Sequence, residues 1–186
     1  MNNNILLDEL PKRTPNQLKI ETDFRESIKF ELLMQDNSIN ETDKISMALN
    51  LYYDEIENIE EALKDMLWFY RCGKEIKTSQ KEGKIKQKQI YSYEFDSEYI
   101  YSAFMQQYKI DLNSIEYMHW WKFKALFEGL TENTQIVKIM GYRAMDLSKI
   151  KDKEEKKRYK KLQKNYALPD MRTEEQKEAD FGKAFW

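Results

Sequence analysis

The sequence predicts an all-α fold of about seven to eight helices packed round a central helix rich in tryptophan, with a small β element near the N-terminus. Two observations favour helices. Most apolar residues recur at spacings of three and four. The 186 residues also include a single valine and only seven threonines, although β-branched side chains are the ones that fill strands. Because aromatic residues make up 13% of the chain, large rings compensate for a shortage of aliphatic side chains.

The predicted central helix runs from Ile115 to Leu130, the densest apolar stretch of the chain. On a helical wheel its large apolar side chains fall on every side, so other helices are expected to cover it on several sides. The residues expected in the core are Trp68, Tyr70, Trp120, Trp121, Phe123 and Phe127. An alternative makes Trp120, Trp121 and Phe123 a hot spot for a partner, but core packing is favoured.

The region before the first helix contains Pro11, Pro15 and a short apolar and polar alternation over 18–21, which is typical of a small strand or part of a hairpin. Asp23, followed by an acidic residue three positions later, then predicts a helix start. Apolar residues spaced by four extend this first helix to about Met34.

Two further helices are predicted in the N-terminal half, the second beginning after Asn58 and closing at Gly73. The expected buried stripes are Ile45, Ala48, Leu49, Tyr52, Tyr53 and Ile56 in one helix, and Ile59, Ala62, Leu63, Met66, Leu67 and Tyr70 in the other.

The stretch 74–90 is rich in lysine, glutamine and glycine and predicts a flexible basic linker or loop. It divides the chain into an N-terminal helical unit, 1–73, and a C-terminal helical unit, 91–186. We expect the two units to form one compact domain, although separate domains remain an alternative.

Four helices besides the central one are predicted in the C-terminal unit. The alternation over 91–95 suggests a brief extended segment, after which Asp96 is expected to cap a helix to about Tyr108. Gly129 is expected to close the central helix. The remaining predicted helices cover 136–144, a lysine-rich stretch over 151–166, and a last helix from Thr173 to Phe185.

The residues offer little catalytic chemistry. His119 is the only histidine and Cys72 the only cysteine, so a site that needs two imidazoles is excluded and a nucleophilic pair would have to join these two residues. The simpler interpretation makes His119 a structural polar side chain and Cys72 a small apolar one. The five glycines match no phosphate-binding loop, and no acidic cluster resembles a metal site. We therefore expect no enzyme activity, no catalytic residue, no cofactor and no metal.

Charge alternates along the chain, with net values of -8 over 1–70, +5 over 71–90, -3 over 91–148 and +4 over 149–186. These blocks either attract a charged partner or satisfy one another. The candidate partner-binding residues are Lys84, Lys86 and Lys88 in the linker, and Phe181, Phe185 and Trp186 at the C-terminal end. Nucleic acid is disfavoured as a partner, since acidic residues interrupt the basic run over 149–164 and the whole chain is acidic.

The single cysteine fits a reducing compartment, no apolar run is long enough to span a membrane, and the first residues do not resemble a signal peptide. We expect a soluble, cytoplasmic protein without a membrane partner.

Several short motifs, taken in order, are similar to a known family. They are Thr22-Asp23-Phe24-Arg25, Leu67-Trp68-Phe69-Tyr70-Arg71-Cys72-Gly73, Tyr91-Ser92-Tyr93, Ile110-Asp111-Leu112, Trp120-Trp121-Lys122-Phe123, Met140-Gly141-Tyr142-Arg143 and Tyr166-Ala167-Leu168-Pro169. Together they resemble the bacteriophage gene product fifteen family from about Thr22 to Phe185.

The resemblance implies a protein of phages or prophages, encoded between the major tail protein and the tape measure protein, and located in the cytoplasm of the host bacterial cell. That position is typical of a tail assembly chaperone, which coats the long helical tape measure protein before the tail tube forms. The implied partners are tape measure or tail proteins, and self-association is left open. Two alternatives are a nucleic-acid-binding accessory protein and a minor structural protein of the virion tail.

Overall fold

The computed structural model describes residues 5–74 and 89–170, and in this part of the chain the all-α prediction is confirmed. Its helices are α1 (Phe24–Gln35), α2 (Glu41–Tyr52), α3 (Ile59–Tyr70), α4 (Ser97–Tyr108), α5 (Trp120–Glu128), α6 (Gln135–Ala144), the short 3-10 turn η1 (Leu147–Lys149) and α7 (Lys153–Asn165). None of these helices is long and apolar enough to cross a membrane. The predicted helix from Thr173 to Phe185 and most of the predicted linker lie outside the described residues.

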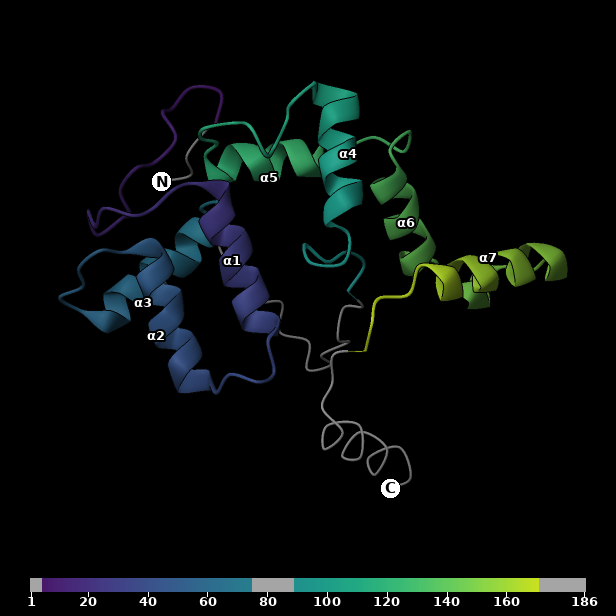
Figure 1. The fold of residues 1–186 in the computed structure, drawn as a ribbon, viewed down its shortest axis with the longest axis horizontal. Coiled ribbons are helices and arrows are strands. Elements are labelled where there is room, and N and C mark those ends of the chain that lie inside the picture. The colour runs from purple at the N-terminus through teal and green to yellow at the C-terminus, as the bar shows by residue number, and fades with distance from the viewer. Residues whose placement is uncertain (1–4, 75–88, 171–186) are drawn as a thin grey trace.

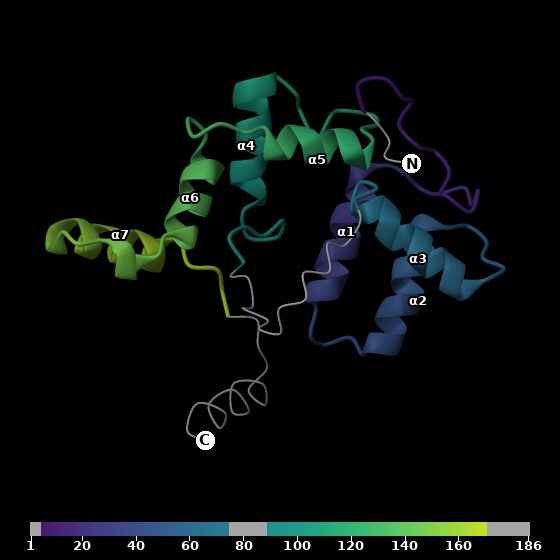
Figure 2. The ribbon, with the colours of Figure 1, turned by 180° about the vertical axis from the view of Figure 1, so that it is seen from behind.

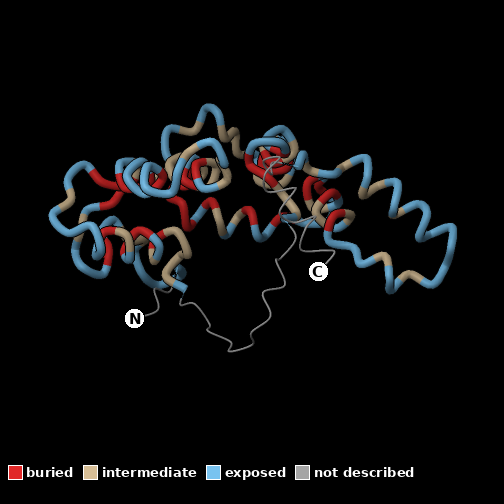
Figure 3. Tube along the Cα trace, turned by 90° about the horizontal axis from the view of Figure 1, so that it is seen from below, coloured by how far each residue is buried: buried red, intermediate tan, exposed pale blue. Residues whose placement is uncertain are grey.

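Helix α5 lies across one side of the molecule, and α1 and α4 extend from it in roughly the same direction (Figures 1 and 2). Helix α1 packs against α2 and α5, and α2 packs against α3. On the other side α4 packs against α6, which contacts α7. Buried rings of α1, α3 and α4 gather around α5. Helix α7 projects outward and has no buried residue (Figure 3).

The centre of the core is the ring of Phe123 on α5. Rings from three helices stack on it, with centroid distances of 4.7 Å to Phe24, 5.1 Å to Phe104 and 5.7 Å to Trp120. Trp120 in turn stacks on Tyr70 at 5.5 Å, which adds α3 to the same cluster. The aromatic residues therefore join helices that lie far apart in the sequence.

The central helix is shorter than predicted. It begins at Trp120, and the expected start at Ile115 is wrong because the backbone just before α5 pairs with another segment. The amide of Phe24 donates to the carbonyl of Met118 at 2.9 Å, and the amide of Trp120 donates to the carbonyl of Thr22 at 2.8 Å. These bonds hold the chain extended up to the first turn of the helix.

Helix α5 is covered on several sides but also has one exposed side. Lys122, Ala125 and Glu128 are exposed and follow one another at intervals of three, so they form one solvent-facing side of the helix. The buried side chains of α5 are Trp120, Trp121, Phe123 and Phe127. Two of its neighbours in sequence, Gly129 as the C-cap and His119 as the N-cap, mark its ends.

Helix α2 ends at Tyr52, so the predicted stripe reaches too far when it includes Ile56. Ile45 in the same stripe is 43% exposed, and Lys44 is buried in its place. The Lys44 ammonium group donates to the carbonyl of Met34 at 3.2 Å, at the end of α1, which explains why a charged residue faces inward.

Helix α3 has the predicted start and end. The Asn58 side chain accepts hydrogen bonds from the amides of the first turn, and Gly73 closes the helix with a φ of 72°. The buried side of α3 differs from the predicted stripe: Ile59 and Leu67 belong to that stripe but are 61% and 37% exposed. The buried side chains are Ala62, Asp65, Met66 and Phe69.

Asp65 explains the displaced stripe of α3. Its carboxylate accepts hydrogen bonds from the Thr14 hydroxyl and from the backbone and side-chain nitrogens of Asn16, at 3.2 and 3.0 Å for the two nitrogens. The N-terminal segment is therefore fastened to the inner side of α3. Within the described residues this segment forms an isolated antiparallel bridge between Arg13 and Lys19, which is a smaller β element than a strand.

Helix α4 begins after Asp96, but the prediction that this side chain caps the helix is wrong. Its carboxylate instead accepts from the amide of Ser92 at 2.9 Å and from the guanidinium of Arg143 on α6. The predicted extended segment over 91–95 ends in a turn, in which the amide of Asp96 donates to the carbonyl of Ser92 at 3.0 Å.

Candidate functional site

The partner-binding residues chosen from the sequence, Lys84, Lys86, Lys88, Phe181, Phe185 and Trp186, lie outside the described residues. The residues chosen for the core are inside them. Trp120, Trp121, Phe123 and Phe127 are buried, and Trp68 and Tyr70 are half-buried.

His119 has a structural position at the start of α5. Its Nδ1 atom accepts the amide proton of Trp121 at 3.0 Å, and its Nε2 atom lies 3.0 Å from the carbonyl of Pro11, which can only accept. The ring is therefore the neutral tautomer with its proton on Nε2. Burial lowers the pKa of His119 below its ordinary value, which favours the same neutral form.

Cys72 also lacks the features of a nucleophile. Burial raises the pKa of its thiol to about 11, so only a small fraction is thiolate near neutral pH. Within residues 5–74 and 89–170, no group of three His, Cys, Asp or Glu side chains is arranged to hold a metal ion.

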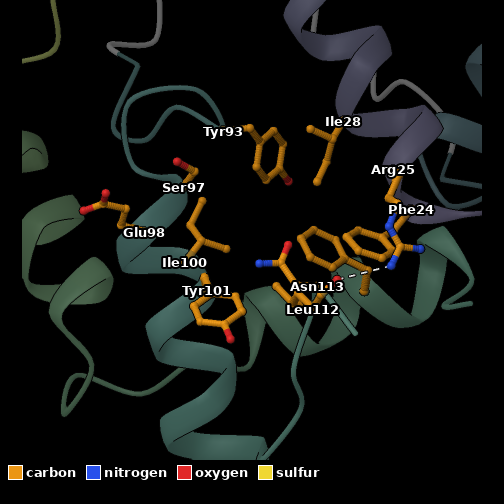
Figure 4. Close-up of a pocket in the computed structure, with 11 residues that line it drawn as sticks. Phe24, Arg25, Ile28, Tyr93, Ser97, Glu98, Ile100, Tyr101, Leu112 and Asn113 are labelled. Atoms are coloured by element: carbon orange, nitrogen blue, oxygen red, sulfur yellow. Dashed lines mark hydrogen bonds between the residues drawn. The ribbon is translucent and has the colours of Figure 1, made fainter. Parts of the chain in front are cut away.

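A cavity of about 580 Å³ lies between α1 and α4, next to α5 (Figure 4). Its floor is apolar and is formed by Phe24, Ile28, Tyr93, Ile100, Leu112 and Phe123. Its rim is polar and is formed by Arg25, Ser97, Glu98, Tyr101 and Asn113. An apolar floor with a polar rim is typical of a site that receives side chains of a partner or a small ligand.

A second cavity, of about 420 Å³, lies farther along α1 towards its C-terminal end. It is lined by Leu32, Leu33, Gln35, Asp36, Ile39 and Glu94. Ile28 in the first cavity and Leu32 in the second are one helical turn apart, and Glu94 comes directly after Tyr93. We call the two cavities together the α1–α4 groove. From Arg25 to Asp36 it follows α1 for about 16 Å, or about three turns at a rise of about 1.5 Å per residue.

Arg25 does not offer a free positive charge to the α1–α4 groove. Its guanidinium lies 3.1 Å from the carboxylate of Asp23, and it also donates to the carbonyls of Leu112 and Ile115 at 3.2 and 2.6 Å. Arg25 therefore fixes the loop before α5 as one wall of the groove. Its charge is already balanced there.

The remaining charges on the α1–α4 groove are acidic. Glu94 and Glu98 are exposed, and neither forms an ion pair within the part of the chain that the structure describes. Asp36 lies at the other end, where hydrogen bonds from Ser38 lower the pKa of its carboxyl group and keep it ionised. The groove thus combines an apolar floor with a negative rim.

Tyr93 is the unusual residue of the groove floor. Only 5% of it is exposed, yet its hydroxyl forms no hydrogen bond of normal geometry among the described residues, although the Tyr91 side chain lies close enough to raise its pKa. Burial raises the pKa of Tyr93 far above its ordinary value, so the group remains a protonated donor. Figure 4 shows this hydroxyl pointing towards the middle of the lining residues. A buried hydroxyl without a partner costs about 1–3 kcal/mol, which a bound acceptor would recover.

The α1–α4 groove was not predicted from the sequence. Its walls come from α1, from the turn before α4 and from the loop before α5, which are separated by dozens of residues, so only the fold brings them together. One signal was present. Ile28 and Leu32 are apolar and one turn apart on α1, and both are only half-buried.

Comparison with known proteins gives one match. The model of the family described as "Bacteriophage Gp15 protein" matches residues 6–168, which is most of the chain and includes every helix described above. No curated protein and no solved structure matches this chain.

Proposed function

Because the chain belongs to the bacteriophage Gp15 family, we propose that this phage protein is a morphogenesis factor, namely a tail assembly chaperone that binds the tape measure protein during tail assembly. The observation that carries the proposal is the α1–α4 groove. It is open, apolar at its floor and about three helical turns long, and these are the properties that a groove for an amphipathic helix requires.

A chaperone of this kind acts by covering apolar surface, not by chemistry. A long helical protein that waits for assembly exposes apolar stripes, and binding them in a groove prevents aggregation. We propose accordingly that the protein is not an enzyme and works in the host cytoplasm. The buried, neutral His119 and the protonated Cys72 thiol support this view, since each is held in an unreactive form.

Co-expression tests the proposal. The full chain and a fragment of the tape measure protein from the same phage are produced together, with a tag on one of them. We expect the two to co-purify and the soluble fraction of the fragment to rise several-fold. If the fragment is equally insoluble with and without this protein and does not co-purify, the chaperone proposal is wrong.

A second candidate function is nucleic-acid binding, which α7 favours. This exposed helix carries Lys153, Lys156, Lys157, Arg158, Lys160, Lys161 and Lys164. Against it, the tyrosines near the basic stretches are engaged in packing: Tyr93 is buried, and Tyr159 packs against Tyr142 at 6.4 Å. Binding to DNA or RNA at low salt that weakens steeply as salt is added would favour this function, and no binding at low salt would exclude it.

A further inference from the structure

We propose that the α1–α4 groove binds a basic amphipathic helix of about three turns, whose apolar side chains enter the two cavities and whose lysine or arginine side chains pair with Glu94 and Glu98. If that helix belongs to the tape measure protein, the inference rests on the proposed function. The chemistry of the groove can nevertheless be tested with any helix of this pattern.

The shape of the groove fits a helix. Its two cavities follow each other along α1, and each is large enough for an aliphatic or aromatic side chain. Apolar side chains at positions i, i+3 or i+4, and i+7 lie along one side of a helix and extend over about 10 Å. A helix lying beside α1 can therefore place successive apolar side chains in successive cavities.

The acidic side chains on the rim of the groove favour a partner with a positive charge. Glu94 lies in the turn that leads into α4, Glu98 lies in the first turn of α4, and both line the groove. Because Arg25 is paired with Asp23, it does not balance Glu94 and Glu98, and neither glutamate forms an ion pair within the described residues. Exposed ion pairs contribute little each, about 0.2–1 kcal/mol, but together they orient a basic helix and repel an acidic one.

The Tyr93 hydroxyl adds a polar contact at the floor. It is buried and remains protonated, so it donates a hydrogen bond to a bound molecule only where an acceptor on that molecule displaces the atoms that cover the hydroxyl. A serine hydroxyl or a glutamine carbonyl between the apolar positions of the bound helix would accept it. This observation is independent of the charges and points to an occupant that reaches the groove floor.

The experiment uses the full chain and a fluorescein-labelled, 18-residue helical peptide with leucines at i, i+3, i+4 and i+7, glutamine between them and lysines elsewhere. The comparison peptide has glutamate in place of every lysine. Binding is followed by fluorescence anisotropy at low and moderate salt. We expect the lysine peptide to bind at least tenfold more tightly than the glutamate peptide. Equal binding of the two peptides, or binding of neither, overturns the proposal.

Two variants locate the binding site. The charge reversal Glu94→Lys/Glu98→Lys is expected to weaken binding of the lysine peptide at least tenfold. The control Glu57→Lys/Glu132→Lys makes the same change of charge at exposed residues outside the groove and is expected to stay within twofold of the wild type. Equal effects of the two double variants would mean that only net charge matters and would overturn the site.

Tyr93→Phe tests the floor of the groove. We expect binding to weaken at least threefold while the urea midpoint of unfolding is unchanged or higher, because the variant removes a hydroxyl that is unpaired in the free protein. Unchanged affinity would show that the bound helix does not reach the hydroxyl and would overturn this contact.

The tape measure fragment separates this inference from the proposed function. If the tape measure fragment co-purifies equally with the wild type and with Glu94→Lys/Glu98→Lys, the proposed function is supported but the assignment of the binding site to the α1–α4 groove is wrong. If the lysine peptide binds the α1–α4 groove but the tape measure fragment does not co-purify, the inference about the groove is supported and the proposed chaperone function is wrong. If the wild type self-associates and the charge reversal abolishes this, the occupant is a second copy and the assignment to a partner is wrong.

Discussion

The guanidinium of Arg143 donates two hydrogen bonds to the carboxylate of Asp96, at 2.5 and 2.9 Å, and both side chains are more than nine-tenths buried. The same guanidinium also donates to the carbonyl of Tyr166 at 2.6 Å and to the carbonyl of Ile90 at 3.0 Å. One side chain on α6 therefore fastens the start of α4 and the chain just after α7.

Replacing Asp96 with alanine is expected to destabilise the protein strongly. The variant leaves the Arg143 charge buried without its carboxylate, and breaking a buried pair from one side costs about 3–5 kcal/mol. The free energy of unfolding, measured by urea titration followed by circular dichroism, should fall by about this amount.

The matched control for Asp96→Ala is Asp54→Ala. Asp54 lies 3.9 Å from Lys19, and these two side chains are 93% and 80% exposed. Loss of this surface pair should barely change the urea midpoint. If both variants unfold at the wild-type midpoint, Asp96 and Arg143 do not hold α4 and α6 together in solution.

A second prediction concerns the two adjacent tryptophans of α5. The indole nitrogen of Trp120 donates to the carbonyl of Tyr70, and that of Trp121 donates to the carbonyl of Phe69, both at 2.8 Å. These carbonyls belong to the last turn of α3, where the carbonyl of Phe69 also accepts from the amide of Cys72 at 2.9 Å, whereas that of Tyr70 has no backbone donor among the described residues. Trp120→Phe keeps an aromatic ring but removes the donor and leaves a cavity, so the free energy of unfolding should fall by about 2–4 kcal/mol.

Trp68→Phe is the comparison for Trp120→Phe. Trp68 is half-buried and packs edge-on against Trp121 at 5.4 Å, and its indole donates no hydrogen bond within the described residues. The same chemical change should therefore cost clearly less at position 68. Equal losses at both positions would show that ring size, not the bond to α3, sets the stability.

The sequence predicted the helices well because their ends carry local signals. Asn58 before α3 and Gly73 after it act through their own backbone neighbourhood, so no knowledge of distant residues is needed. The start of α5 failed for the opposite reason. Its position depends on the backbone hydrogen bond that the amide of Phe24 donates to the carbonyl of Met118, which is 94 residues away.

Buried polar residues limited the prediction in the same way. Asp65 lies outside the predicted buried stripe and Asp96 was predicted to cap a helix, yet each is buried because a partner from a distant segment satisfies its carboxylate. The α1–α4 groove likewise exists only once the helices are packed. Its lining residues come from several separate segments, and no single segment carries a pattern that predicts a groove.

A third prediction concerns the reactivity of Cys72. Burial raises the pKa of its thiol to about 11, so the thiolate fraction at pH 8 is about a hundredfold lower than for a thiol with the ordinary pKa of 9.0. Alkylation by iodoacetamide should be slower in the folded protein by about that factor or more. The control is the same chain in 8 M urea, where alkylation should proceed at the rate of a free thiol. Rapid alkylation of the folded chain would show that Cys72 is accessible and ionised.

The last prediction concerns pH and His119. Burial lowers the pKa of His119 below 6.5, and protonation would remove the acceptor that Nδ1 provides for the amide of Trp121. The unfolded chain therefore binds the proton more readily than the folded chain, so the full stability is present above about pH 6.5 and is lost as the pH falls below it. The slope cannot exceed about 1.4 kcal/mol per pH unit for one proton.

His119→Asn isolates this contribution, because asparagine is also a good N-cap but does not titrate. Urea titrations between pH 7.5 and 5.5 should show the wild type losing stability as the pH falls and the variant losing less. Glu31 also affects how stability depends on pH. Burial raises its pKa, so its contribution to stability grows as the pH falls, opposite to that of His119, and it is the same in the wild type and the variant. Since His119 is the only histidine, the difference between the two pH profiles measures its proton alone. Parallel profiles would mean that the imidazole takes up its proton as readily in the folded chain as in the unfolded one, and that its position at the start of α5 does not depend on its charge.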